Sequence, residues 1–220
     1  MTEILFTVLQ DILFFVLLIG GGWFFGRAFY KIYKGEPVFA KKVFTATENG
    51  IYKIMGVDPK EEMTAKKYAL GILLFSVFSL IFFIAVVMLQ AFLTMNPEHI
   101  EGMSWHLAFN TAASFVTNTN WQAYSGETGL SYLSQMICLT VQNFVSGAVG
   151  IAVLFALIRG FVGRQKKTIG NCWADITRVT LFMIPVCFVG AFILVSQGVP
   201  QTMSGSVSYT ALNGEASRCH

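Results

Sequence analysis

Four long runs of apolar residues without Lys or Arg divide the chain, at residues 4–25, 68–93, 130–157 and 179–197. A hydrocarbon core of about 30 Å needs roughly 20 apolar residues in helical form, so the pattern predicts four transmembrane helices. The first run contains Asp11, which is costly at membrane depth. Asp11 therefore either faces a partner group or is hydrated near the outer interface.

Lys and Arg are concentrated in two loops between these runs, and this predicts the orientation of the chain. Nine Lys and Arg residues lie in residues 27–67, five lie in 159–178, and only Arg218 lies elsewhere. The positive-inside rule places both loops in the cytoplasm, so the N-terminus, residues 94–129 and the tail after Gln197 face outward. Glu3 precedes the first run and basic residues follow it, which favours a retained helix over a cleaved signal peptide.

Composition supports the membrane assignment and narrows the chemistry. The chain is 55% hydrophobic and 12% charged, with a mean hydropathy of +0.62. The sequence has no phosphate-binding loop and no H-E-x-x-H or C-x-x-C motif, so any energy source is expected on another chain. An enzyme using Glu98, His99 and His106 at the outer surface has little support, because no nucleophile with an oriented base can be named.

Residues 94–129 are too long for a tight turn and too apolar for a solvated loop. Ser104 is a suitable N-cap, and the apolar residues after it predict a short pore helix over 104–115, about half a membrane thickness long. Residues 116–122 that follow are rich in hydroxyl and amide groups. Irregular backbone at membrane depth is tolerated only inside protein or beside water. We therefore expect a pore helix with a filter loop; the alternative is an external loop in which Asn and Thr form turns.

The filter loop offers neutral oxygen atoms that can replace the water shell of a monovalent cation. The expected ion-binding residues are Val116, Thr117, Asn118, Thr119, Asn120 and Gln122, with K⁺ at Thr117, Asn118 and Thr119. In the following apolar run, Gln142 and Asn143 are candidate pore-lining residues, although polar and small residues there also serve helix packing.

The stretches "FNTAASFVTNTNWQAYSGETGLSYLSQM" and "LTVQNFVSGAVGIAVLFALIRGF" closely resemble the potassium-binding subunit of the bacterial Kdp potassium-importing ATPase. The resemblance implies an all-α membrane protein of the bacterial inner membrane, with potassium-channel-like repeats of helix, pore loop and helix. It also implies that potassium is the transported ligand and that no cofactor is bound. The P-type ATPase subunit, the B component of the Kdp complex, is expected to hydrolyse ATP. The C and F components are expected to complete the complex. Membrane lipid surrounds the chain, and no nucleic acid is expected.

Family members are much longer, so the resemblance covers their N-terminal part only and implies a truncated chain. The expected organisation is a transmembrane helix over 1–29, a cytoplasmic loop over 30–67, and a first repeat over 68–161 with helices at 68–93 and 130–158. A cytoplasmic loop over 162–178, the first helix of a second repeat over 179–197 and an external tail over 198–220 follow. The alternative function is a non-conducting membrane interaction module that binds partner helices through small-residue faces.

The first cytoplasmic loop mixes charged and apolar residues and contains a short amphipathic stretch. We expect this stretch to lie on the inner leaflet or against a partner protein of the complex.

Overall fold

The computed structural model describes residues 2–38, 40–163, 167–199, 204–205, 207–210 and 216–219. Four segments in this part of the chain are helical, long and apolar enough to cross a membrane, which confirms an all-α membrane fold. They are α1 (Thr2–Tyr33), α3 (Ala65–Leu89) with a short 3-10 turn (Gln90–Phe92), the segment Tyr132–Val162, and α8 (Cys172–Ser196). The third comprises α6 (Tyr132–Ser134), a π-helical turn (Gln135–Thr140) and α7 (Val141–Val162).

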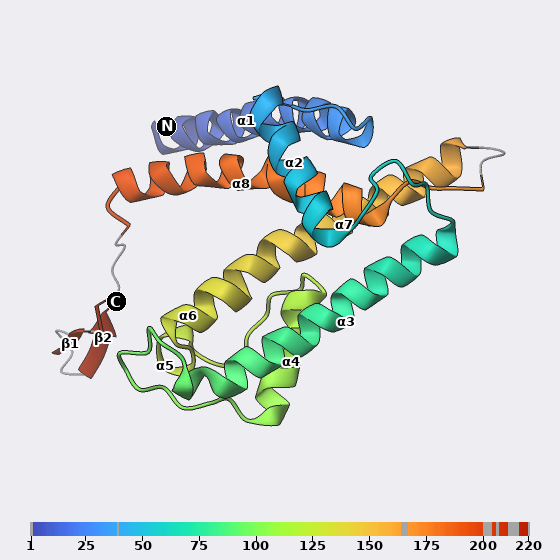
Figure 1. Cartoon of the computed structure of the whole chain (residues 1–220). Helices are drawn as coiled ribbons and strands as arrows, with labels where there is room; N and C mark the ends of the chain where they lie inside the picture. The colour runs from blue at the N-terminus through green and yellow to red at the C-terminus, as the bar shows by residue number, and fades with distance from the viewer. Residues whose placement is uncertain are drawn as a thin grey trace.

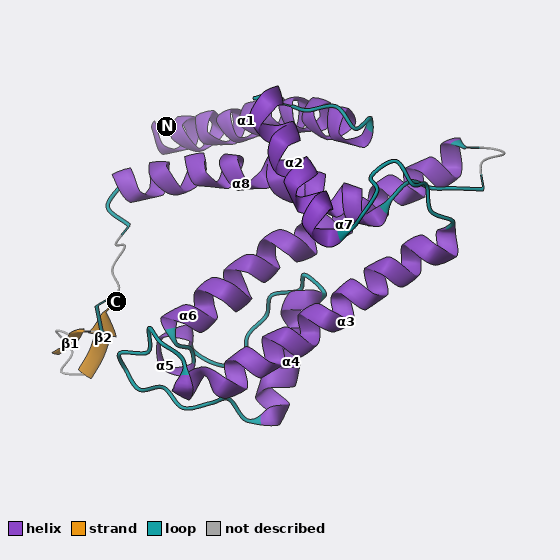
Figure 2. Cartoon of the chain, in the orientation of Figure 1, coloured by secondary structure: helices purple, strands orange, loops and turns teal. Residues whose placement is uncertain are grey.

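Three shorter helices connect the spans. The helix α2 (Lys41–Met55) follows α1, whereas α4 (Trp105–Val116) and α5 (Gly126–Gly129) lie between α3 and α6. Figure 1 shows α4 beside α3 and α7, and Figure 2 shows that helices make up most of the described part of the chain, with strands only in the tail. The core beside α4 contains Phe83 and Val87 of α3 together with Ala112 and Phe115 of α4. This packing holds the short helix inside the protein.

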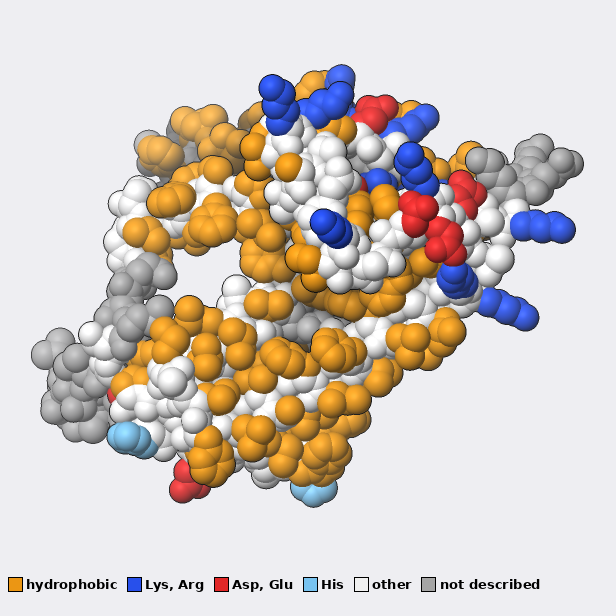
Figure 3. Space-filling view, in the orientation of Figure 1, with side chains coloured by type: hydrophobic (Ala, Val, Ile, Leu, Met, Phe, Trp, Pro, Cys, Tyr) orange, Lys and Arg blue, Asp and Glu red, His pale blue; other side chains and the backbone are white. Residues whose placement is uncertain are grey.

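The loops that follow α1 and α7 lie at the same end of the molecule. Figure 3 shows most of the Lys and Arg side chains of the visible face gathered at that end, with long apolar surfaces beyond them. This arrangement agrees with four alternating spans whose two basic loops face one side of a membrane.

Helix α8 begins at Cys172, earlier than the predicted Val179. The side chain of Asn171 caps it by accepting hydrogen bonds from the backbone N–H groups of Trp173 and Ala174. Two charged residues then lie inside the helix, where Asp175 pairs with Arg159 and Arg178 pairs with Glu48. Both charges were predicted to lie in a loop, because their partners are distant in the sequence.

Helix starts elsewhere also differ from the sequence pattern because of capping side chains. Helix α3 begins at Ala65 after Thr64, whose hydroxyl oxygen accepts a hydrogen bond from the backbone N–H of Lys67. Helix α6 begins at Tyr132 after Ser131, which accepts one from the N–H of Ser134. Hydrophobicity marks the apolar stretch of a span, whereas these caps mark its ends.

The tail contains a small antiparallel hairpin of β1 (Val207–Thr210) and β2 (Ala216–Cys219). Before it, the carbonyl oxygen of Ser204 accepts a 2.5 Å hydrogen bond from the hydroxyl of Tyr132. The rest of the external tail predicted at 198–220 lies largely outside the described residues.

Candidate functional site

The candidate ion site begins at the C-terminus of α4. This helix has twelve residues and ends inside the helical bundle, beside α3 and α7. Its N-cap is Ser104, as predicted, although the Ser104 side chain makes no capping hydrogen bond. The C-terminus carries the negative end of the helix dipole, so its electrostatic field favours a cation near Thr117.

The sign of φ alternates along the backbone after α4. Thr117 has φ −85°, Asn118 has φ 58° and Asn120 has φ 60°, whereas Thr119 is not among the residues with positive φ. Asn tolerates the left-handed region better than most residues.

The N–H groups of residues 117–120 turn back to the end of α4. Those of Thr119 and Asn120 donate to the carbonyl oxygen of Ser114 at 2.9 and 3.3 Å, and those of Thr117 and Asn118 donate to Ala113 and Phe115. Within the described part of the chain, no hydrogen bond ends on the carbonyl oxygens of residues 117–120. These four oxygens remain available to a ligand.

Two buried serines hold the loop in this shape. The Ser114 hydroxyl donates to the carbonyl oxygen of Trp121 at 3.0 Å, so Ser114 binds both ends of the turn. From α7, the Ser146 hydroxyl donates to Oδ1 of Asn118 at 3.2 Å. The Asn118 side chain is therefore turned toward the protein, which leaves its backbone to face the site.

Gln90, at the end of the second span, holds the outer part of the loop. Its side chain is fully buried, and Nε2 donates to the carbonyl oxygens of Glu101 and Gly129 at 2.7 and 3.0 Å. Its Oε1 accepts from the N–H of Ser131 at 3.1 Å. Gln90 thus joins the segment before α4 to the segment after the loop. A lone amide at the end of an apolar run was the available signal for this residue, and sequence reasoning missed it.

The predicted site residues fall into two groups. Val116 ends α4, while Thr117 to Asn120 and Gln122 form an exposed loop beside an open groove of about 400 Å³ that Thr117 and Thr119 line. On α7, Gln142 is buried and Asn143 is exposed. Behind the loop, burial raises the pKa of the Tyr124 phenol to about 12, so this group stays neutral near the site.

Comparison with known proteins identifies the family. The family described as "Potassium-transporting ATPase A subunit" matches residues 12–220 of the chain. The chain belongs to this family.

Individual relatives agree with this assignment. A potassium-transporting ATPase potassium-binding subunit from Listeria monocytogenes serotype 4a is 54% identical over 95% of the chain and 37% of the relative. Proteins of the same name from Pseudomonas syringae pv. tomato and Clostridium botulinum (strain Eklund 17B / Type B) are 50% and 54% identical, over 91% and 88% of the chain and 36% and 34% of the relative. This member of the potassium-transporting ATPase A subunit family therefore spans little more than a third of the length of these relatives.

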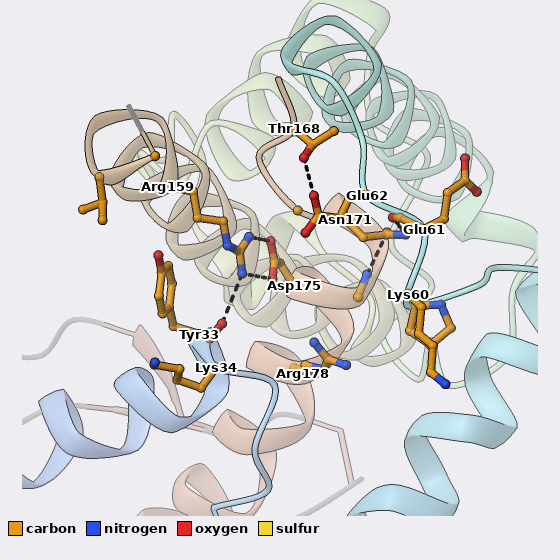
Figure 4. Close-up of a pocket in the computed structure, with 15 residues that line it drawn as sticks. Tyr33, Lys34, Lys60, Glu61, Glu62, Arg159, Thr168, Asn171, Asp175 and Arg178 are labelled. Atoms are coloured by element: carbon orange, nitrogen blue, oxygen red, sulfur yellow. Dashed lines mark hydrogen bonds and ion pairs between the residues drawn. The ribbon is translucent and has the colours of Figure 1, made fainter. Parts of the chain in front are cut away.

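A second polar cluster lies at the basic end of this A-subunit family member. Arg159 of α7 pairs with Asp175 of α8, and its guanidinium also donates to the carbonyl oxygen of Tyr33 at 3.3 Å (Figure 4). It donates to the carbonyl oxygen of Ile169 as well, at 3.2 Å. The Tyr68 hydroxyl of α3 lies 3.0 Å from Oδ2 of Asp175. The cluster joins α1, α3, α7 and α8 beside a pocket of about 610 Å³. Its charges are paired with one another, which indicates a structural role.

Proposed function

We propose that this chain supplies one wall of a potassium filter in a potassium-importing ATPase. The wall consists of the carbonyl oxygens of residues 117–120, with Val116 and Gln122 at its two ends. The observation that carries the proposal is the separation of donors and acceptors in this loop. Its N–H groups are consumed by the end of α4, whereas its carbonyl oxygens accept no hydrogen bond from the described residues.

The chemistry of this wall fits a monovalent cation. The oxygens are neutral, and divalent ions are usually held by carboxylates. The C-terminus of α4 adds a partial negative charge at the same place. An anion has no comparable partner here, because the loop presents oxygen atoms and no cationic side chain.

The wall is one part of a larger site. Thr117 to Asn120 are exposed on one side, whereas a filter surrounds its ion with oxygen atoms. Other pore loops must therefore close the site. In the proposed complex potassium enters from the outside, and the P-type ATPase subunit (the B component) hydrolyses ATP, so this chain is not catalytic. The C and F components complete the assembly in the bacterial inner membrane, with the N-terminus of this chain outside.

A chimera tests this function. Residues 12–197 of the chain replace the matching segment of the Listeria monocytogenes relative, which is produced with the other ATPase subunits in a bacterium lacking other potassium uptake. We expect growth at limiting external potassium. The control is the same strain with the relative's segment deleted. A chimera that reaches the membrane in the assembled complex but fails to support uptake, while the parent supports it, would count against the proposal.

A further inference from the structure

Helix α2 has two faces of different character. Phe44 and Tyr52 are buried on one face, and Glu48 between them accepts hydrogen bonds from the Tyr52 hydroxyl and from Nε of Arg178, both at 2.6 Å. At about 100° per residue these three side chains fall on one stripe. This stripe fixes the helix on the transmembrane bundle.

The contacts of the buried face set the depth of α2. Phe44 belongs to the same buried cluster as Ala28 and Ile32, in the last two turns of α1. Ala28 lies about 7.5 Å along the helix from the end of α1 at Tyr33, and Arg178 lies about 9 Å from the start of α8 at Cys172. Figure 1 shows α2 crossing α1 and α8 rather than running along them. The helix therefore lies near the membrane interface, across the spans.

The opposite face of α2 is apolar and has a basic border. Val43 and Ile54 are 68% and 88% exposed, and they lie within about 20° of each other around the helix. Lys42 and Lys53 are exposed along one edge of this face. The only acidic residue of α2, Glu48, is paired on the buried face.

We propose that α2 is a binding surface for anionic phospholipid, with Val43 and Ile54 among the acyl chains and Lys42 and Lys53 on the lipid phosphates. Apolar side chains bordered by lysines at interfacial depth match the boundary between acyl chains and negatively charged headgroups. Helix α1, on which α2 packs, also has exposed side chains from Leu5 to Ile19. This inference does not depend on the proposed ion site.

Fluorescence of the full chain in vesicles tests the surface. The environment-sensitive label NBD is attached at Ile54→Cys, with Cys187 and Cys219 replaced by Ser. The matched control carries the label at Asn49→Cys, about 140° around the helix. Vesicles contain phosphatidylcholine with a small fraction of nitroxide-labelled phosphatidylglycerol or nitroxide-labelled phosphatidylcholine, which quench the label on contact.

We expect the label at position 54 to report an apolar surrounding, to be quenched more strongly than the label at position 49, and to prefer phosphatidylglycerol. In the double variant Lys42→Gln/Lys53→Gln, the preference of the site for phosphatidylglycerol over phosphatidylcholine should fall. We expect a loss of about fivefold for each lysine removed, equivalent to about 1 kcal/mol. The control Lys60→Gln/Lys66→Gln, with the same change of charge, should leave it unchanged.

Three results would overturn the proposal. Equal quenching by the two lipids in the chain that retains its lysines would show that the surface does not select anionic lipid, whatever the variants do. A label at position 54 that remains in water would show that the face is not in the membrane. Shielding of that label only after the other ATPase subunits are added would identify a protein as the occupant.

Discussion

Arg159 and Asp175 form a two-pronged ion pair between α7 and α8, with Nη1 to Oδ2 at 2.5 Å and Nη2 to Oδ1 at 3.0 Å. The Asp175 side chain is 2% exposed, and the Tyr68 hydroxyl donates to it as well as to the carbonyl oxygen of Ala152. A buried carboxylate with these partners cannot lose its charge cheaply, because the guanidinium would then remain unpaired. The pair therefore fixes how the two helices meet.

Replacing Asp175 by Asn should lower the free energy of unfolding by about 3 kcal/mol, since it leaves the largely buried charge of Arg159 uncompensated. The measurement is chemical unfolding of the full chain in detergent micelles. Lys67→Gln is the control, because it removes an ion pair with Glu61 that is about half exposed on both sides, and its effect should be small. Equal stability of Asp175→Asn and the unmodified chain would show that the pair does not hold α7 and α8 together.

Replacing Gln90 by Leu should loosen the outer part of the pore loop. The change leaves the partly buried carbonyl groups of Glu101 and Gly129 and the buried N–H of Ser131 without their partner, at about 1–3 kcal/mol for a fully buried unsatisfied group. Hydrogen exchange in a bilayer should show the amide of Ser131 exchanging at least tenfold faster. Gln10→Leu, at an exposed position of α1, should not change that rate. An unaltered rate in Gln90→Leu would mean that other contacts hold the loop.

Asn120 tests the importance of backbone handedness in the proposed filter. Its φ of 60° costs a non-glycine residue without a local hydrogen-bonding side chain about 1–2 kcal/mol. In the assembled chimera, Asn120→Ala should therefore raise the potassium concentration for half-maximal ATP hydrolysis by roughly fivefold or more. Asn120→Gly should stay close to the parent, because Gly adopts this conformation freely. Equal potassium concentrations for half-maximal ATP hydrolysis in the two variants would show that the backbone conformation at residue 120 does not affect potassium affinity.

Gln122→Arg introduces a fixed positive charge next to the proposed ion path. At an effective dielectric constant near 20, a unit charge about 6 Å from the ion opposes it by roughly 3 kcal/mol, or about two orders of magnitude in affinity before relaxation and screening. Gln122→Asn should shift affinity less.

Gln135→Arg is the control for Gln122→Arg, because it introduces the same charge at another position in the chain. The Gln135 amide donates to the carbonyl oxygens of Leu130 and Gly126, so this change should chiefly reduce assembly. Unchanged potassium affinity and sodium discrimination in an assembled Gln122→Arg complex would favour the external-loop interpretation.

The four spans were predictable from hydrophobicity and charge. The length of an apolar run and the position of the basic residues around it depend only on residues close together in the sequence. The short helix α4 was also predictable, since Ser104 and the apolar residues after it form a local pattern. Partners distant in the sequence were not predictable. Asp175 was counted as a loop charge because Arg159, its partner, comes from another helix.

The same limit applies to the site. The hydroxyl- and amide-rich loop marked where oxygens are concentrated, but it did not indicate which of them face a ligand. In the structure the Asn118 side chain binds Ser146, and the Thr117 hydroxyl donates to the carbonyl oxygen of Ala113 at 2.8 Å. Backbone carbonyls rather than these side chains are therefore the available oxygens, and this follows only from the tertiary arrangement of α4 and α7.

The most direct test of the central claim is to locate a bound monovalent cation. The chimeric protein in its complete complex would be crystallised with Tl⁺ in place of K⁺, and anomalous scattering would give the position of the ion. We predict an anomalous peak within coordination distance of the carbonyl oxygens of residues 117–120, lost when K⁺ competes. Ordered Tl⁺ elsewhere in the pore, with no peak beside these oxygens at saturating concentration, would contradict the account.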